Sequence, residues 1–551
     1  MRKRLAITIS GAVSLGSYEA GVMYEIVRAL REHNESAQTA EEQKTEIDVF
    51  TGASAGGMTA AIAAQKLLFE ADAFRSESDN PFFNPWVRDV DLPGLLQLSG
   101  DDNPAKSIFS TQFVETVSKK YLTNRYQSVP LPPPVQHPAA SRKLRIGLAV
   151  SNLNGIDYNV VPPPGQPNAA GFQYTRFQDE FIRPLTADGS LEDRLDVWEP
   201  IRQAAVACGA FPFAFRVQEL QRTAGEYEPN AAFPNPDLRF AYTDGGVFQN
   251  EPLGMAKNFV DEIDGHQNTE SRFYLFVSPH AKASVMNRKF TADGAKLWPA
   301  ALQLVAGIFN ESQYQDWARA DEINAHIYLF NDRATGLQKV LLKPDSLGVT
   351  ELKQTAASLL KLLFPSDMDD ALKNRERSRL KGQFAPEYDE LKQAKGGDTA
   401  DVWIDSILVL EKSANLGTRD EMTIYTITAT DDTTAGELLY SFGGFFSEKI
   451  RQYDYDRGRL NARKFLRQHA NASGPNEIGP LHFNDSPDPV LDAKLGHMGV
   501  GDLNEDLRRQ VRDRLYDRLD DMMQAAGMSG LVRWAVKTFY LSSKLNQIFK
   551  L

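Results

Sequence analysis

Residues 47–64 read Ile-Asp-Val-Phe-Thr-Gly-Ala-Ser-Ala-Gly-Gly-Met-Thr-Ala-Ala-Ile-Ala-Ala. The first four residues predict a short apolar strand, the glycine-rich middle a tight turn and the alanine-rich remainder a helix. Gly52 and Gly56 stand two residues before and after Ser54, so the backbone can turn sharply there without side-chain clashes. This context favours a nucleophilic serine; the alternative is a glycine-serine turn that only caps a helix.

A second strand–turn–helix unit lies at the N-terminus, where residues 4–9 predict a strand and 10–17 a turn. The spacing of the glycines in this turn does not fit a dinucleotide-binding fingerprint. We expect instead that the backbone N–H groups of Gly11, Ala12 and Val13 converge on an oxyanion formed at the serine.

A carboxylate for this serine is offered by Thr243-Asp244-Gly245-Gly246, which follows a predicted strand at 238–242. The glycines after Asp244 leave its side chain uncovered, so it could accept the Ser54 proton as the hydroxyl attacks a carbonyl carbon. The alternative is an aspartate that only stabilises its own turn.

Together, these elements resemble the patatin-like phospholipases, in which a glycine-rich oxyanion turn, G-x-S-x-G and D-G-[AG] follow one another. The resemblance covers about residues 4–280, and the small-residue run 201–212 is a softer match. It implies a three-layer α/β/α fold, a Ser54–Asp244 dyad without histidine, oxyanion donors in the first turn, a lipid or phospholipid substrate and no cofactor. Residues 445–466, which include Asp-Tyr-Asp-Arg-Gly-Arg, are similar to a C-terminal segment of bacterial patatin-related proteins.

The first turn departs from the family's pattern, G-G-G-x-[KR]-G. Ala12 and Val13 stand where glycines are usual, and Leu15 stands where a basic residue is common. We expect Ala12 and Val13 to serve as backbone donors only if their φ angles are negative, because non-glycine residues avoid positive φ.

A histidine could turn the dyad into a triad. Of the eight histidines, His280 fits the chain order of an α/β-hydrolase triad, since it follows a predicted strand at 272–279. A surface histidine at the end of a strand is the interpretation we favour. The sequence has no metal-binding spacing such as H-E-x-x-H, so no metal is predicted.

Composition excludes several classes of protein. The chain has 551 residues, 42% of them hydrophobic, and is long enough for more than one folded domain. Its net charge of −12 argues against general nucleic-acid binding. The single cysteine, Cys208, excludes an intrachain disulfide and suits a reducing compartment. With no signal peptide or transmembrane stretch in evidence, we expect a cytoplasmic protein. No oligomeric state is indicated.

Strands alternate with helices over residues 1–285, which predicts a mainly parallel sheet with helices on both faces. Within this core, the proline-rich segment 71–143 predicts either a lid over the site or an ordinary loop excursion. Residues 286–551 predict a mixed, helix-rich extension. In it we expect helices at 297–325 and 351–364, and strands at 326–331, 338–343, 402–411 and 422–430.

The C-terminal segment 531–551 carries four cations and no acidic side chain, with aromatic residues between them. One interpretation is a helix at a membrane surface. The alternative is a helix docked on the core with a basic outer face.

The sequence therefore predicts a serine lipid acyl hydrolase. Two alternatives remain open: a lipid- or partner-binding protein that keeps the fold, suggested by the altered first turn, and a thioesterase or peptidase that uses the same nucleophile.

Overall fold

The computed structural model describes residues 2–550 except 161–170, 188–191, 234–236, 265–270, 281–289, 293–296, 344–347, 365–369, 415–421, 430–433, 437–440, 473–476, 487, 489–490 and 492–502. The chain forms two compact units. The first comprises Met1–Val260, Glu270–Asp316 and Thr423–Leu551, and the second Asp261–Thr269 and Trp317–Met422.

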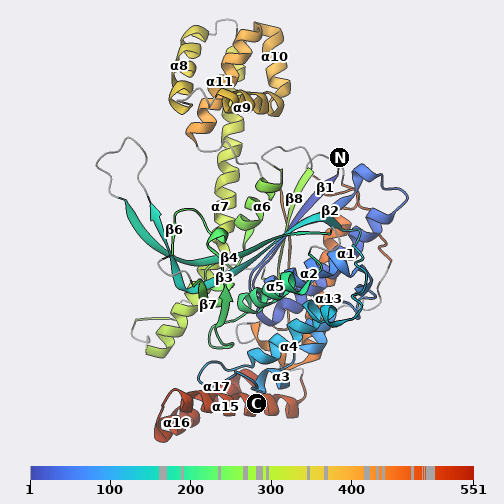
Figure 1. Ribbon diagram of the computed structural model, residues 1–551, viewed down its shortest axis with the longest axis vertical. Coiled ribbons are helices and arrows are strands. Elements are labelled where there is room, and N and C mark those ends of the chain that lie inside the picture. The colour runs from blue at the N-terminus through green and yellow to red at the C-terminus, as the bar shows by residue number, and fades with distance from the viewer. Residues whose placement is uncertain are drawn as a thin grey trace. The chain divides into compact units, whose positions relative to one another are not determined.

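The first unit is built on one mixed, mostly parallel sheet (Figure 1). Its central strands run in the order β3-β2-β1-β8-β9 and all pair in parallel, while β4, β6 and β7 pair with β3 antiparallel and β5 pairs with β7 antiparallel. The strands are β1 Lys3–Ile9, β2 Thr45–Gly52, β3 Ala140–Val160, β4 Phe172–Thr186, β5 Gln218–Gln221, β6 Ala231–Ala232, β7 Arg239–Asp244, β8 Ser271–Ser278 and β9 Ile424–Thr428.

Helices cover both faces of this sheet. The helices of the first unit are α1 Gly16–Glu35, α2 Ser54–Phe69, α3 Leu92–Leu96, α4 Thr111–Leu122, α5 Leu195–Cys208, α13 Glu448–His469, α15 Glu505–Ala525, α16 Gly530–Val536 and α17 Ser542–Phe549, together with most of α6 Leu253–Asp264 and the start of α7 Leu297–Leu342.

Alternation along β3 shows which helices lie on which face. Ile146 and Leu148 belong to the main core with α1, α2 and α5, whereas a Cβ at Gly147 would meet Met255 and Phe259 of α6. Because successive strand residues point to opposite faces, α6 covers the face opposite the main core. The predicted three-layer α/β/α architecture is confirmed.

The second unit is helical in its described part. It contains the rest of α7 and α8 Val349–Leu363, α9 Asp370–Gln383, α10 Ala385–Lys395 and α11 Gly397–Ser413. The strands predicted at 326–331, 338–343 and 402–411 are wrong, since these residues lie in α7 and α11. The apolar residues there recur at helical spacing: Trp403, Ile404, Ile407 and Leu408 of α11 are all buried in the core of this unit.

Neither unit ends near residue 285, where the sequence divided the chain. The last part of the chain returns to the first unit, because β9 pairs with β8 at the edge of the sheet and α13 packs along α1. Sequence reasoning also overlooked β4, although Phe172, Tyr174 and Ile182 belong to a β-branched and aromatic run that is typical of strands.

Candidate active site

Ser54 lies at the sharp turn between β2 and α2, with φ of +50°. The glycines on either side are required by close backbone approach. A Cβ at Gly52 would lie 2.6 Å from the Gly56 carbonyl group, and one at Gly56 would lie 2.3 Å from the carbonyl oxygens of Ile9 and Ser10. No side chain fits these positions, so the two glycines allow the backbone of the turn to pack directly against β1 and against the first turn of α2.

Asp244 is the last residue of β7. This strand runs antiparallel to β2 and β3, and its last residue lies near the end of the sheet at which β2 leads into Ser54. β7 runs antiparallel to β3, and Asp244 pairs with Val150. Two residues earlier on β3, Leu148 pairs with Gly52 of β2. The antiparallel course of β7 was not predicted, and it brings the carboxylate beside the turn that carries Ser54.

The two side chains are in direct contact. Ser54 Oγ donates a hydrogen bond to Asp244 Oδ2 at 2.6 Å, with no imidazole between them. Burial raises the pKa of Asp244 to about 7, although the hydrogen bonds from Ser54 and the Gly246 N–H act in the other direction. A carboxylate with such a pKa is half-ionised near neutral pH, which suits a general base.

Several groups that sequence reasoning did not identify hold Asp244 in place. Its Oδ1 accepts from the Gly246 N–H at 2.7 Å, its own N–H donates to Ala210 O at 2.9 Å, and its carbonyl oxygen accepts from Ser151 Oγ at 2.7 Å. A Cβ at Gly245 would lie 2.0 Å from Ala149 O. Ser151 lies within β3, but nothing in its sequence context indicated this contact.

The first turn lies directly beside the serine, and here the structure differs from the prediction. The Gly11 N–H donates to Asn250 O at 3.1 Å, so it is occupied within the protein. A Cβ at Gly11 would lie 3.1 Å from Ser54 Cβ. In the described part of the chain, the N–H groups of Ala12 and Val13 donate to no other group. Of the three predicted oxyanion donors, these two remain as candidates.

Ala12 has φ of −143°, but Val13 has φ of +53°, a region that β-branched residues rarely occupy. The expected negative φ is therefore found at Ala12 but not at Val13, where the expectation was wrong. The Val13 N–H nevertheless has no acceptor among the described residues, so it stays a candidate donor at positive φ. Such strain costs of the order of 1–3 kcal/mol and persists only where the surroundings impose it.

An apolar cavity opens from Ser54. Apart from three hydroxyl-bearing residues, Ser54, Ser118 and Tyr121, its walls are apolar side chains and one glycine. The lining residues are Val13, Ser54, Ala55, Met58, Ile62, Pro85, Trp86, Val90, Leu95, Val114, Val117, Ser118, Tyr121, Leu122, Ala205, Val206, Gly209, Phe211, Phe215 and Phe445. Nine of these twenty come from the segment 71–143, which forms a wall of the cavity.

Two other reactive residue types lie close to the site or were considered for it. Cys208 lies beneath the turn, with its Sγ 3.8 Å from Ser54 O, and burial raises the pKa of its thiol well above the usual value. A thiol in this state is a poor nucleophile. His280 follows β8, and its backbone N–H donates to Ser278 Oγ at 3.2 Å.

Among the described residues, no group of three or more histidine, cysteine, aspartate or glutamate side chains is arranged to hold a metal ion. No helix in the same part of the chain is both long and apolar enough to cross a bilayer.

The sequence model of the patatin-like phospholipase family matches residues 7–257. This range contains the first turn, the Ser54 turn and Asp244. This match supports the assignment of residues 7–257 to the patatin-like phospholipase family, and with it lipid acyl hydrolase activity in general. No curated protein matches the chain.

Proposed function

We propose that this protein hydrolyses fatty-acyl esters of phospholipids or related lipids through a Ser54–Asp244 dyad. The observation that carries the proposal is the 2.6 Å hydrogen bond from Ser54 Oγ to Asp244 Oδ2 at the end of an apolar cavity. An acyl chain would bind in the cavity by the hydrophobic effect, with its ester carbonyl carbon next to Oγ.

In the reaction, Oγ attacks the ester carbonyl carbon while its proton passes to Asp244 Oδ2. The N–H groups of Ala12 and Val13 stabilise the oxyanion of the tetrahedral intermediate, together with the N-terminal end of α2. Asp244 then returns the proton to the leaving alcohol, which departs and leaves an acyl-enzyme. Asp244 next takes a proton from water as the water attacks the acyl carbon, and Ser54 Oγ regains a proton as the fatty acid is released. No cofactor takes part in these steps.

A fluorophosphonate probe tests the nucleophile directly. We expect the probe to label the wild-type protein and to leave Ser54→Ala unlabelled. Ser118→Ala is the matched control, because Ser118 also lines the cavity but its hydroxyl group donates to Glu115 O and accepts from Arg202. If the wild-type protein is not labelled, the protein is better described as a binding protein that retains the fold.

The leaving group is tested separately with a panel of substrates. We expect a long-chain phospholipid or acylglycerol to be cleaved with a higher kcat/KM than an acyl thioester or a peptide amide. A preference for thioesters or peptides would leave the nucleophile in place but would assign the protein to a different class of hydrolase.

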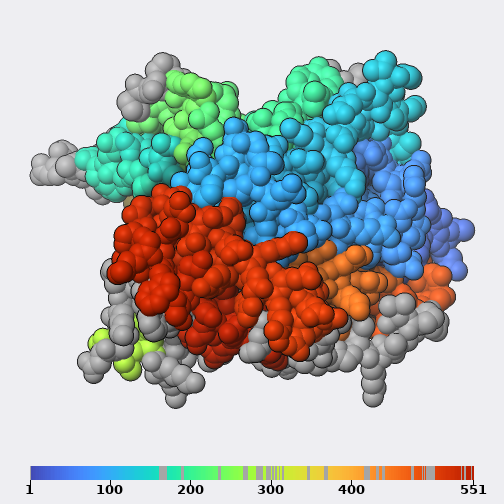
Figure 2. Space-filling view, turned by 90° about the horizontal axis from the view of Figure 1, so that it is seen from below, coloured from blue at the N-terminus to red at the C-terminus, as the bar shows by residue number. Residues whose placement is uncertain are grey.

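We further propose that the protein contacts membranes through α16. Leu531 is 79% exposed and Trp534 59% exposed, whereas Leu545 and Phe549 of α17 are buried against α15 and its neighbours. Part of the face that these helices form is seen in Figure 2, in red. The apolar residues available to a lipid surface thus belong to the first half of 531–551, and the second half is docked.

Co-sedimentation with vesicles of mixed phosphatidylcholine and phosphatidylglycerol tests this contact. We expect the wild-type protein to bind and a Leu531→Glu, Trp534→Glu double variant to bind at least several-fold less. Leu362→Glu is the control, since Leu362 is 76% exposed but lies on α8 of the second unit. Equal binding by the double variant and the wild-type protein would remove the proposal.

A further inference from the structure

We propose that the segment 441–446, which lies outside the matched family domain, completes the active site by holding the first turn through Ser14. The inference rests on the proposed function. It makes Ser14 a positioning residue that acts through the backbone of Ala12 and Val13, and it gives the C-terminal part of the chain an indirect role in the reaction.

Ser14 is fully buried, and its hydroxyl group makes two hydrogen bonds to this distant segment. Its Oγ donates to Ser441 O and accepts from the Gly444 N–H at 2.9 Å. A Cβ at Gly444 would lie 2.6 Å from Ser14 Oγ, so a larger residue at this position would collide with the Ser14 hydroxyl group. Ser14 immediately follows Val13, and its hydrogen bonds therefore determine where the turn lies relative to Ser54.

The segment is itself held by two buried charged residues of α13. The Asp454 carboxylate accepts from the N–H groups of Ala435 at 2.6 Å and Gly436 at 2.9 Å. The Arg451 guanidinium donates to Gly444 O at 3.1 Å and to Val87 O at 2.9 Å. Asp454 thus holds Ala435 and Gly436, and Gly436 O in turn accepts from the Gly443 N–H of the segment at 3.1 Å. Arg451 holds the segment directly at Gly444.

α13 is in turn packed against α1, which follows the first turn. A Cβ at Gly21 of α1 would lie 2.0 Å from Tyr455 O, and a Cβ at Gly458 of α13 would lie 2.0 Å from Tyr18 O. The helices therefore meet backbone to backbone at two reciprocal positions. This arrangement explains the glycine in the Asp-Tyr-Asp-Arg-Gly-Arg sequence of α13.

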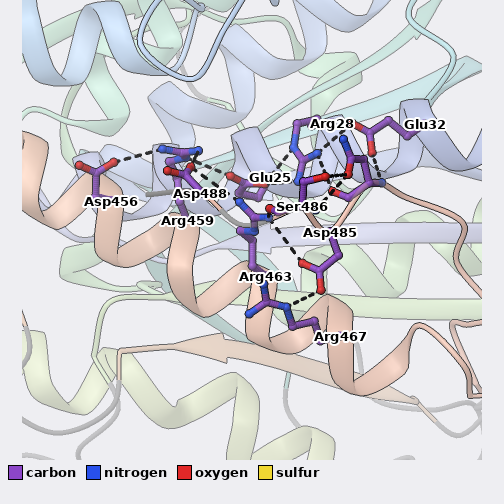
Figure 3. A network of polar contacts seen from close by, with 11 residues as sticks. Glu25, Arg28, Glu32, Asp456, Arg459, Arg463, Arg467, Asp485, Ser486 and Asp488 are labelled. Atoms are coloured by element: carbon purple, nitrogen blue, oxygen red, sulfur yellow. Dashed lines mark hydrogen bonds and ion pairs between the residues drawn. The ribbon is translucent and has the colours of Figure 1, made fainter. Parts of the chain in front are cut away.

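A network of ion pairs extends this contact between the helices (Figure 3). Arg459 Nε donates to Glu25 Oε1 at 3.0 Å, and the other Glu25 oxygen accepts from Arg28 at 2.7 Å. Arg459 also pairs with Asp488 at 2.7 Å. Because Glu25 and Arg459 are buried, removing either one would take a partner from a buried charge and loosen the contact between α1 and α13.

Backbone strain indicates why the first turn needs this support. Of the five non-glycine residues with positive φ in the described part of the chain, Val13, Ser54 and Ser441 lie at the site or at its support. Val13 and Ser441 are joined through the side chain of Ser14. Val13 and Ser441 both adopt an unfavourable backbone conformation, and such conformations persist only where the surrounding structure imposes them.

The same segment also reaches the cavity. Phe445 is one of its lining residues, together with Phe211 and Phe215. The first turn and the cavity wall are therefore both completed by residues beyond position 257, where the family match ends.

The test uses the full chain and follows the rate of fluorophosphonate labelling and the hydrolysis of a soluble ester. The first step is to show that the probe labels the wild-type protein and not Ser54→Ala, as the proposed function requires. If the wild-type protein is not labelled, the proposed function itself is wrong, and this inference falls with it. Given labelling, we expect Ser14→Ala to lower kcat and the labelling rate about 10- to 100-fold while KM changes less than about threefold, because an oxyanion donor acts on the transition state.

A double-variant comparison separates positioning from a general loss of stability. Glycine adopts positive φ without strain, so Val13→Gly should make the turn depend less on Ser14. We expect Ser14→Ala to lower kcat less in the Val13→Gly background than in the wild-type background. An equal or larger loss in that background would overturn the proposal, as would an unchanged kcat in Ser14→Ala itself.

Ser406→Ala is the matched control, because it removes a buried hydroxyl that donates to Val402 O within α11 of the second unit. We expect wild-type kcat and KM from it. Should Ser14→Ala fail to fold, Asp454→Asn provides the second test, since it weakens the hold on Ala435 and Gly436 without touching the turn. The same fall in kcat at unchanged KM is expected there, and wild-type kcat would overturn the proposal.

Discussion

The two turns that meet at the site are held in different ways. The turn around Ser54 is stabilised by its own sequence, because Gly52 and Gly56 allow contacts of the backbone with itself and with β1. The first turn has Ala12 and Val13 where the family pattern that it resembles has glycines, and Val13 is at positive φ. Its conformation relies on hydrogen bonds between Ser14 and a segment more than four hundred residues later in the chain.

The difference shows that a strained turn can be maintained by remote structure when local sequence does not favour it. Glycines make a turn independent of its surroundings, whereas non-glycine residues make it dependent on the elements that pack against it. If this comparison is correct, substitutions in the Ser54 turn act locally and severely, and substitutions that loosen α13 act on the first turn from a distance.

The largest effect is expected from Gly56→Ala. The added Cβ would lie 2.3 Å from two carbonyl oxygens that cannot move without disturbing β1, so we expect a loss of at least about 4 kcal/mol in the free energy of unfolding and no detectable labelling of Ser54. Urea denaturation measures the loss. Gly225→Ala is the control, because nothing lies within 4 Å of its Cβ. Similar stability of the two variants would show that the turn tolerates side chains.

Asp244→Asn is expected to lower kcat about 10²- to 10⁴-fold, since it removes the proposed general base for Ser54. In the wild-type protein, kcat/KM should rise with pH and reach half its maximum near pH 7, because Asp244 must be ionised to accept a proton. A profile that is flat between pH 5 and 8 would contradict this role.

The same substitution should change the pH dependence of stability. The pKa of Asp244 is about 7 in the folded protein and near 3.8 when unperturbed, so the folded state binds the proton more tightly. Protonated Asp244 therefore stabilises the folded state. This stabilisation is fully present below pH 3.8 and is lost as pH rises through 7. We therefore expect Asp244→Asn to melt at a higher temperature than the wild-type protein at pH 8, with the difference shrinking toward pH 5.

Arg459→Met tests the distant support of the first turn. It leaves Glu25 buried without its partner on α13, and we expect a loss of about 3 kcal/mol in the free energy of unfolding. At a urea concentration where the variant remains folded, we also expect slower labelling of Ser54. Arg509→Met is the control, because its pair with Glu505 is exposed and contributes little. Wild-type labelling by folded Arg459→Met would mean that α13 does not support the turn.

The smallest effect is expected from Val13→Gly. Relief of the strain at positive φ outweighs the conformational entropy of glycine, so we expect a gain of about 1 kcal/mol or less. Ala12→Gly should have the opposite sign, since Ala12 has φ of −143° and gains nothing from glycine. Thermal melts of the two variants, measured side by side, sharpen the comparison; equal shifts would show that Val13 is not strained.

Much of the first unit could be predicted from the sequence, because its strand–turn–helix units carry local signals. The runs before and after Ser54 have the composition of a strand and a helix, and the structure contains both. The helices of the second unit were partly mistaken for strands. In short runs such as 402–411, the apolar residues fit both the two-residue period of a strand and the 3.6-residue period of a helix. Only the burial of Trp403 and Ile407 against neighbouring helices shows that the helical period applies.

By itself, the sequence determined which residues have the chemical character for an acyl transfer: a serine between two glycines, an aspartate before two more, and a turn near the N-terminus. These are local properties of side chains and backbone. Only the tertiary structure decided that β7 runs antiparallel and brings Asp244 to Ser54, that the Gly11 N–H is occupied by Asn250, and that Ser14 is held by Ser441 and Gly444. The physical reason is that hydrogen bonds between distant segments depend on how the sheet and its helices pack, and no local pattern specifies that packing.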